Sequence, residues 1–177
     1  MPDEFAEKVA EVEHGLADAA EGYAPDHEHR PLAAYAVLSA AFGASFAGSL
    51  VAAQRHAGGL PARVETRDIV LMGVATHKVT RLLAKDRVTS FLRAPFAEYQ
   101  DRAGHGELEE KARGRGLRLA TGELIICPYC LAQWVVGGFA VGIVAAPRLT
   151  RLLAAMWTAE AISDFAQLAY HAAEERA

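Results

Sequence analysis

Cysteine and aromatic residues are scarce in this 177-residue chain, and its positive charges do not outnumber its negative ones. Its two cysteines are too few for the disulfide framework of a small secreted protein. The formal net charge is −4, so no overall basic field exists to hold nucleic acid, and we expect no nucleic-acid partner. The N-terminus is acidic and lacks a basic stretch followed by an apolar run, which disfavours a cleaved signal peptide.

What the chain has in quantity is hydrophobic residues, which make up 52% of it and include 37 Ala. They gather in two stretches without a formal charge, Leu32–Gln54 and Leu124–Pro147. About 20 apolar residues suffice for a helix to cross a hydrocarbon core of about 30 Å. A buried helix of a soluble domain is the alternative, but such helices rarely avoid charge over this length. The two stretches therefore predict membrane-spanning helices.

Two further apolar stretches follow helical spacing but are interrupted by charges. A charge inside a span is costly, and it usually faces other helices or reaches the headgroups. Residues 31–177 are thus predicted to form an all-α integral membrane bundle of about four helices. The helices are expected at about residues 32–54, 68–84, 125–146 and 149–173.

Two polar segments complete this domain organisation. Residues 1–30 hold nine acids and are interpreted as an amphipathic N-terminal extension. Residues 85–123 form a polar connection, in which 107–113 are expected to make a helical turn. The apolar positions of the extension recur at helical spacing: Phe5, Val9, Val12 and Leu16.

The distribution of Lys and Arg predicts the orientation in the membrane. Eight lie in 85–123, three in 55–67 and two in 147–151. By the positive-inside rule we expect a multi-pass protein of the inner (plasma) membrane, with 85–123 and both termini in the cytoplasm. The lipid bilayer is then the main partner, and no protein partner can be named. Small residues every four along the first span favour a homo-oligomer: Ala36, Ala40, Ala44, Gly48 and Ala52.

The sharpest local motif is Cys127-Pro128-Tyr129-Cys130, a CxxC at the expected start of a helix. Its letters match the glutaredoxin active site, but the sheet and the later cis-proline loop of that fold have no counterpart here. Three interpretations stay open. The pair is a redox dithiol at the membrane surface, half of a zinc site completed by a second chain, or two small apolar residues packed at a helix start.

Charged residues inside the second and fourth helices form another constellation. They either pair with each other, which makes their burial tolerable, or line a proton or ion pathway; we favour the pairing. The residues are His77, Lys78, Arg81, Glu160 and Asp164. Just after the second helix, Asp86, Arg87 and Arg93 form an interface motif that would attract anionic headgroups or simply signal topology.

Three blocks of sequence resemble a known bacterial family. The first runs from Thr76 to Phe96 and contains His77-Lys78, Lys85-Asp86-Arg87 and Arg93-Ala94-Pro95; the second is Gly122-Glu123-Leu124, and the third joins the CxxC to Trp134. Together, over about 68–170, they resemble domain-of-unknown-function family 1360, small integral membrane proteins without an established reaction. The Ala-rich composition and Ser163-Asp164-Phe165 resemble its actinobacterial branch.

The resemblance implies a membrane protein but assigns no role to the cysteines. We expect a non-enzymatic membrane or envelope component without a cofactor. A membrane-bound thiol–disulfide protein, with Cys127 attacking and Cys130 resolving, is the first alternative. A zinc-bridged oligomer formed through the CxxC pairs is the second.

Overall fold

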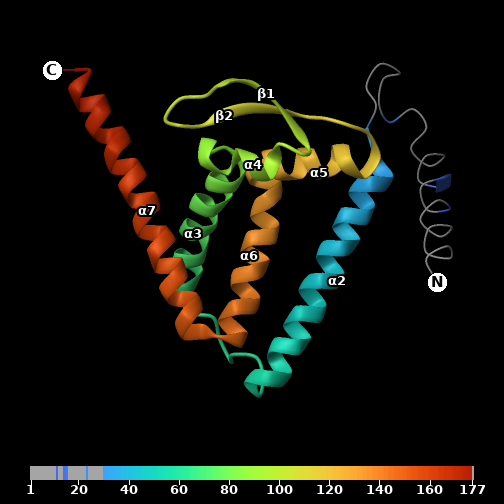
Figure 1. Cartoon of the computed structure of the whole chain (residues 1–177). Coiled ribbons are helices and arrows are strands. Elements are labelled where there is room, and N and C mark those ends of the chain that lie inside the picture. The colour runs from blue at the N-terminus through green and yellow to red at the C-terminus, as the bar shows by residue number, and fades with distance from the viewer. Residues whose placement is uncertain (1–10, 12–13, 16–22, 24–29, 177) are drawn as a thin grey trace.

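The computed structural model describes residues 30–176 together with 11, 14, 15 and 23. The amphipathic extension expected at 1–30 therefore lies almost wholly outside the described residues. Four long helices run between two ends of the molecule and splay apart toward the upper end of Figure 1. They are α2 (Leu32–Ala57), α3 (Thr66–Ala84), α6 (Pro128–Ala145) and α7 (Pro147–Glu174).

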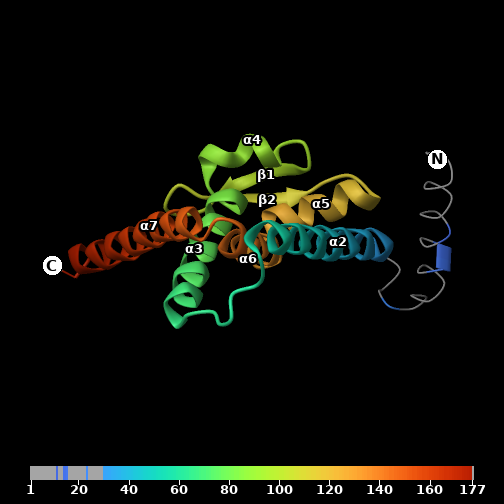
Figure 2. The same cartoon turned by 90° about the horizontal axis from the view of Figure 1, so that it is seen from below.

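The four helices form an open row and not a closed bundle. α2 packs on α6, α6 also packs on α3, and α7 packs on α3 and α6. Figure 2 shows α2 and α7 at opposite edges of this row. α2 ends at Gly58, whose φ of 76° is left-handed and suits a glycine cap. Both chain reversals at the lower end are short: residues 58–65 between α2 and α3, and Ala146 between α6 and α7.

The second charge-free stretch is divided between two helices, which differs from the single helix expected over 125–146. Leu124–Ile126 belong to the end of α5 (Gly116–Ile126), and α6 begins at Pro128. Cys127 between them has φ −102° and ψ 105°, an extended conformation. A residue before proline is driven out of the helical region by contact with the proline ring, which explains the break.

The expectation of an all-α fold is wrong for part of the polar segment. Strands β1 (Ala97–Arg102) and β2 (Leu108–Ala112) pair antiparallel, so the helical turn expected at 107–113 is a strand. The hairpin turn has positive φ at His105 (58°) and Gly106 (85°). Positive φ at both central residues is what a type I′ hairpin turn requires.

The hairpin belongs to a cap over the upper ends of the long helices, which we call the platform, residues 85–126 (Figure 1). It also contains the short helices η1 (Arg87–Thr89) and α4 (Ser90–Arg93), and α5. A two-stranded sheet is marginal by itself, so the hairpin depends on its contacts with these elements. Among the described residues, those of the platform form the largest number of side-chain hydrogen bonds.

Small residues fill the interior while large apolar residues lie outside. Eight of the ten buried apolar residues among those described are Ala, including Ala75, Ala154 and Ala161 where α3 meets α7. Large side chains of α7 point outward instead, with Leu152 68% and Ile162 62% exposed. This is the reverse of the core of a typical water-soluble protein.

The lower ends of α3 and α7 are joined by a partly buried ion pair. The Arg151 guanidinium donates to both carboxylate oxygens of Asp68, at 2.9 and 2.7 Å, and Asp68 is 2% exposed. One turn higher, the Thr158 hydroxyl donates to the Leu71 carbonyl at 3.1 Å. A bidentate pair fixes both distance and orientation, so these contacts set how α7 lies against α3.

Candidate functional site

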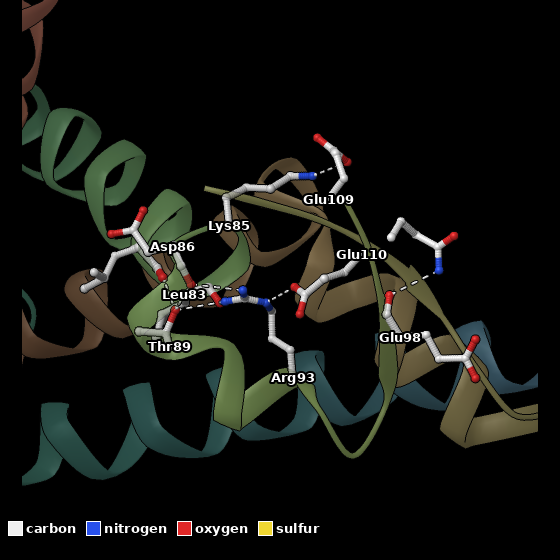
Figure 3. Close-up of polar contacts among 10 residues, drawn as sticks. Leu83, Lys85, Asp86, Thr89, Arg93, Glu98, Glu109 and Glu110 are labelled. Carbon is white, nitrogen blue, oxygen red and sulfur yellow. Dashed lines mark hydrogen bonds and ion pairs between the residues drawn. The ribbon is translucent and has the colours of Figure 1, made fainter. Parts of the chain in front are cut away.

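Arg93 is the centre of the platform. Its guanidinium donates to the Glu110 carboxylate, to the Leu83 carbonyl at 2.7 Å, to the Thr89 hydroxyl at 2.8 Å and to the Asp86 carbonyl at 3.0 Å (Figure 3). Arg93 is 1% exposed. It thus joins the C-terminal end of α3, where helix carbonyls lack partners, to η1 and β2.

The interface motif therefore separates into different environments. Arg93 is interior, in contrast to its expected position at a headgroup surface, because four acceptors from three elements surround it. Arg87 is exposed and remains able to face lipid or water. Asp86 is half-buried, and its backbone carbonyl, not its carboxylate, binds Arg93.

The charges of the second and fourth helices come together in part. The Lys78 ammonium lies 2.7 Å from Asp164 and 3.7 Å from Glu160. His77 stacks on the ring of Phe165, with the ring centroids 6.0 Å apart. Arg81 is not part of this cluster, because its guanidinium binds the carboxylate of Glu107 at the turn of the hairpin.

These residues border a cavity of about 720 Å³ between α3, α7 and the hairpin turn, which we call the polar cavity. His105 of the hairpin turn and His171 of α7 both line this cavity, and the centroids of their rings are 6.3 Å apart. Its charged and histidine lining is His77, Lys78, Arg81, Asp86, His105, Glu107, Asp164 and His171.

Among the acids that line the polar cavity, Asp86 is the one whose carboxylate forms no ion pair with a described residue. Burial raises its pKa, and repulsion by Glu107 and Asp164 adds to this, while attraction by Lys78 and Arg81 opposes it. A raised pKa means that the folded protein disfavours the carboxylate. The charge of Asp86 therefore costs stability at neutral pH.

We expect Asp86→Asn to raise the melting temperature in detergent at pH 7. Below about pH 4 the carboxyl is protonated in both the folded and the unfolded chain, so the gain should disappear. Thermal unfolding at the two pH values measures this difference. Glu98→Gln, an exposed platform carboxylate, is the matched control and should shift neither melting temperature. A gain that is larger at low pH would contradict the assigned direction.

The CxxC motif borders a second cavity of about 660 Å³, between α2, α5 and the start of α6, which we call the thiol cavity. Cys127 is half-buried and Cys130 is exposed. On the opposite side, the Tyr35 phenol donates to the Glu123 carboxylate, and Arg30 lies 3.9 Å from the same carboxylate. The lining comprises Arg30, Tyr35, Leu38, Ser39, Phe42, Ala120, Glu123, Leu124, Cys127, Cys130, Gln133 and Trp134.

The two cysteines have different positions at the start of α6. Cys127 is the N-cap, and its Sγ accepts a hydrogen bond from the backbone N–H of Cys130 at 3.2 Å. The N-terminal end of a helix and an N–H donor both stabilise a thiolate. Both thiols are free. The arrangement favours Cys127 as the nucleophile of the pair.

A zinc site is not assembled from the part of the chain that the structure describes. No group of three or more His, Cys, Asp or Glu side chains there is placed to hold a metal ion. A structural zinc ion needs four ligands, so the CxxC pair would require two from elsewhere. The zinc-bridged oligomer stays a prediction.

Several site residues were not anticipated from the sequence. No role for Glu110, Glu123 or Tyr35 follows from the sequence alone, although Glu123 stands in the second of the three family blocks. Asp68 and Arg151 offered a usable signal, because opposite charges near the starts of two apolar helices at the same depth are expected to pair. The signal for Glu123 was similar: it is the last charge before the second charge-free stretch.

Comparison with known proteins connects this geometry to a family. Residues 71–170, more than half of the chain, match the proteins of unknown function DUF1360. The chain belongs to the DUF1360 family. This confirms the resemblance expected from the three sequence blocks; the actinobacterial branch stays a prediction. The matched range of the DUF1360 fold runs from α3 into α7 and leaves out α2.

A curated relative is the sporulation protein YjcA of Bacillus subtilis (strain 168). It is 35% identical over 72 residues, which is 39% of this DUF1360 chain and 61% of the relative. The chain thus spans about three fifths of the relative's length. No solved structure matches the chain.

Proposed function

We propose that the chain is a multi-pass protein of the bacterial inner membrane and a non-enzymatic membrane or envelope component. α2 and α6 are long and apolar enough to cross a bilayer. Only 6% and 11% of their most apolar stretches are buried in the protein. The core helix of a soluble protein is mostly buried, so the exposure of these two helices is the observation that supports a lipid environment.

In this proposal α3 and α7 also cross the bilayer, and the platform lies in the cytoplasm. α3 and α7 have 19 and 28 residues, which correspond to about 28 and 42 Å of helix, and the hydrocarbon core is about 30 Å thick. Lys78, Glu160 and Asp164 then pair near the platform, where charge is better tolerated than at mid-membrane. The eight Lys and Arg of 85–123 favour the cytoplasmic side.

Homo-oligomerisation through α2 belongs to the same proposal. The outer face of α2 is lined by small residues, and no side chain lies within 4 Å of a Cβ built on Gly48. Such faces let two membrane helices approach closely. The exposed small positions are Ala40, Ala44, Gly48 and Ala52.

Extraction of membranes with alkaline carbonate tests the membrane placement. An integral protein stays in the pellet, because stripping charge-based contacts does not remove buried apolar helices from lipid. Exposed basic residues of the platform can hold a peripheral protein on anionic headgroups, so the carbonate step, not simple sedimentation, is decisive. Release into the supernatant would contradict the proposal.

A second candidate function, thiol–disulfide exchange, is favoured by one observation. The Cys127 Sγ accepts an N–H bond at a helix N-terminus and borders a cavity. In that role the Cys127 thiolate attacks a disulfide and Cys130 resolves the mixed disulfide. We expect a maleimide to label Cys127 of the reduced, folded protein faster than it labels Cys130, because Cys127 accepts the N–H bond at the start of α6.

The controls for this test are the single variants and metal analysis. Cys130→Ser should keep the fast labelling, and Cys127→Ser should lose it. Two thiols that stay unreactive until the protein is unfolded would leave only a packing role. Zinc co-purifying near one ion per pair of chains would favour the zinc-bridged oligomer instead.

A further inference from the structure

Two of the three helices that line the thiol cavity, α2 and α6, are apolar enough to cross a bilayer. Leu38 and Phe42 project from α2, and Trp134 projects from α6. A molecule dissolved in the hydrocarbon layer therefore meets this cavity between the helices, beside the platform. Its volume of about 660 Å³ lies within the range of pockets that take a small ring-shaped ligand.

An aromatic floor closes the cavity toward the middle of the helices. The rings of Phe42 and Trp134 meet edge to face with centroids 5.2 Å apart, and Phe46 stacks below Phe42 at 5.8 Å. Here α2 and α6 are in tight contact, because a Cβ on Gly137 would lie 3.1 Å from the Phe42 ring. A flat ring placed on this floor lies between aromatic side chains and the thiols.

The polar groups of the cavity fit a neutral ligand with carbonyl oxygens. Ser39 and Gln133 supply a hydroxyl and an amide, and neither side chain forms a hydrogen bond to another described residue. The charged groups, Glu123 and Arg30, face each other at 3.9 Å. Because this carboxylate is part of the lining, an anionic headgroup would be repelled, whereas a neutral carbonyl can accept from the amide or hydroxyl.

We propose that the thiol cavity binds the ring of a lipid-soluble quinone and that the quinone oxidises the Cys127–Cys130 dithiol. The Cys127 thiolate adds to the quinone ring, and Cys130 then attacks the Cys127 sulfur. The S–S bond forms as the C–S bond breaks, and the electron pair stays on the ring. The two thiol protons end on the two quinone oxygens, giving a disulfide and a hydroquinone. This inference rests on the proposed membrane placement and deepens the dithiol function.

Binding is tested with the full chain in lipid nanodiscs and a fully substituted benzoquinone that carries a decyl tail. In a Trp157→Phe background the remaining fluorescence comes from Trp134, on the cavity floor. We expect the quinone to quench it saturably. Phe42→Ala should weaken binding by about tenfold, because it removes the edge-to-face partner of Trp134. Phe91→Ala, which removes an exposed phenylalanine of α4 outside the lining, is the matched control and should bind as the parent does.

Electron transfer is tested under anaerobic conditions with the pre-reduced protein. We expect one quinone to be reduced and two thiols to be lost per chain, with Cys127→Ser and Cys130→Ser both inactive. Oxidation by glutathione disulfide but not by the quinone would overturn the quinone proposal and leave the dithiol function standing. Thiols inert toward both oxidants would overturn both. Saturable quenching with no reduction would overturn the electron transfer. Recovery of the chain from the carbonate supernatant would overturn the membrane placement and with it the lipid-soluble quinone, but not the dithiol function.

Discussion

Replacing Arg93 by Ala should lower the free energy of unfolding by about 3–5 kcal/mol, the usual loss when one partner of a buried ion pair is removed. The variant leaves the Glu110 carboxylate, 6% exposed, without its positive partner. It also removes the donor to the Leu83 carbonyl at the end of α3. The hairpin loses its buried side-chain attachment, because Arg93 joins Glu110 of β2 to η1 and α3, whereas the Arg81–Glu107 and Lys85–Glu109 pairs are exposed.

Chemical unfolding in detergent, followed by circular dichroism, measures the effect. Arg87→Ala removes an exposed arginine from the same segment and should stay within about 0.5 kcal/mol of the parent. Arg93→Lys keeps the charge but not the planar fork, so it should fall between the two. An Arg93→Met, Glu110→Gln double variant should recover part of the loss, because no buried charge is left unpaired. Equal stability of Arg93→Ala and Arg87→Ala would contradict the central role of Arg93.

Gly122→Ala should also be strongly destabilising, by about 1–3 kcal/mol, as for other over-packed sites. A Cβ at this position of α5 would lie 2.6 Å from the Phe96 carbonyl oxygen and 2.9 Å from the Ala112 Cβ. The first of these atoms is backbone and the second is held by the hairpin, so neither moves away without shifting the platform. The added methyl group must push α5 off the strands.

The control is Gly138→Ala in α6, where no atom lies within 4 Å of the added Cβ. This change should be neutral or stabilising by up to about 1 kcal/mol, because Ala is the better helix former. The two substitutions are chemically identical, so their difference in melting temperature isolates the close approach of α5 to the hairpin. A Gly122→Ala variant as stable as Gly138→Ala would show that this approach is not tight.

The positions of the long helices could be predicted from the sequence because lack of charge over a membrane-length stretch is a local signal. The expected helix at 32–54 is α2, and the other three helices also lie close to their expected positions. The break at Cys127 also has a local signal, because Cys127 precedes Pro128. The apolar run across this position nevertheless suggested one continuous helix. Local sequence was therefore sufficient for the helices and misleading only at their junction.

The hairpin and the Arg93 cluster could not be predicted in this way. β1 and β2 contain mostly charged residues and few β-branched ones, so strand propensity gave no indication of them. Arg93 stands in a basic segment and looks solvated, and its burial depends on Glu110, which is 17 residues away. The thiol cavity also depends on tertiary structure, because it brings Tyr35 of α2 to Glu123 of α5.

Site-directed labelling in intact protoplasts tests the membrane placement most directly. In a Cys127→Ser, Cys130→Ser background, one new cysteine replaces Leu60, exposed in the lower connection, and another replaces Gln100, exposed on β1. An impermeant maleimide should label Leu60→Cys in intact protoplasts and Gln100→Cys only after permeabilisation. Labelling of both positions from the same side, or of Gln100→Cys from outside alone, would contradict a membrane-crossing protein with a cytoplasmic platform.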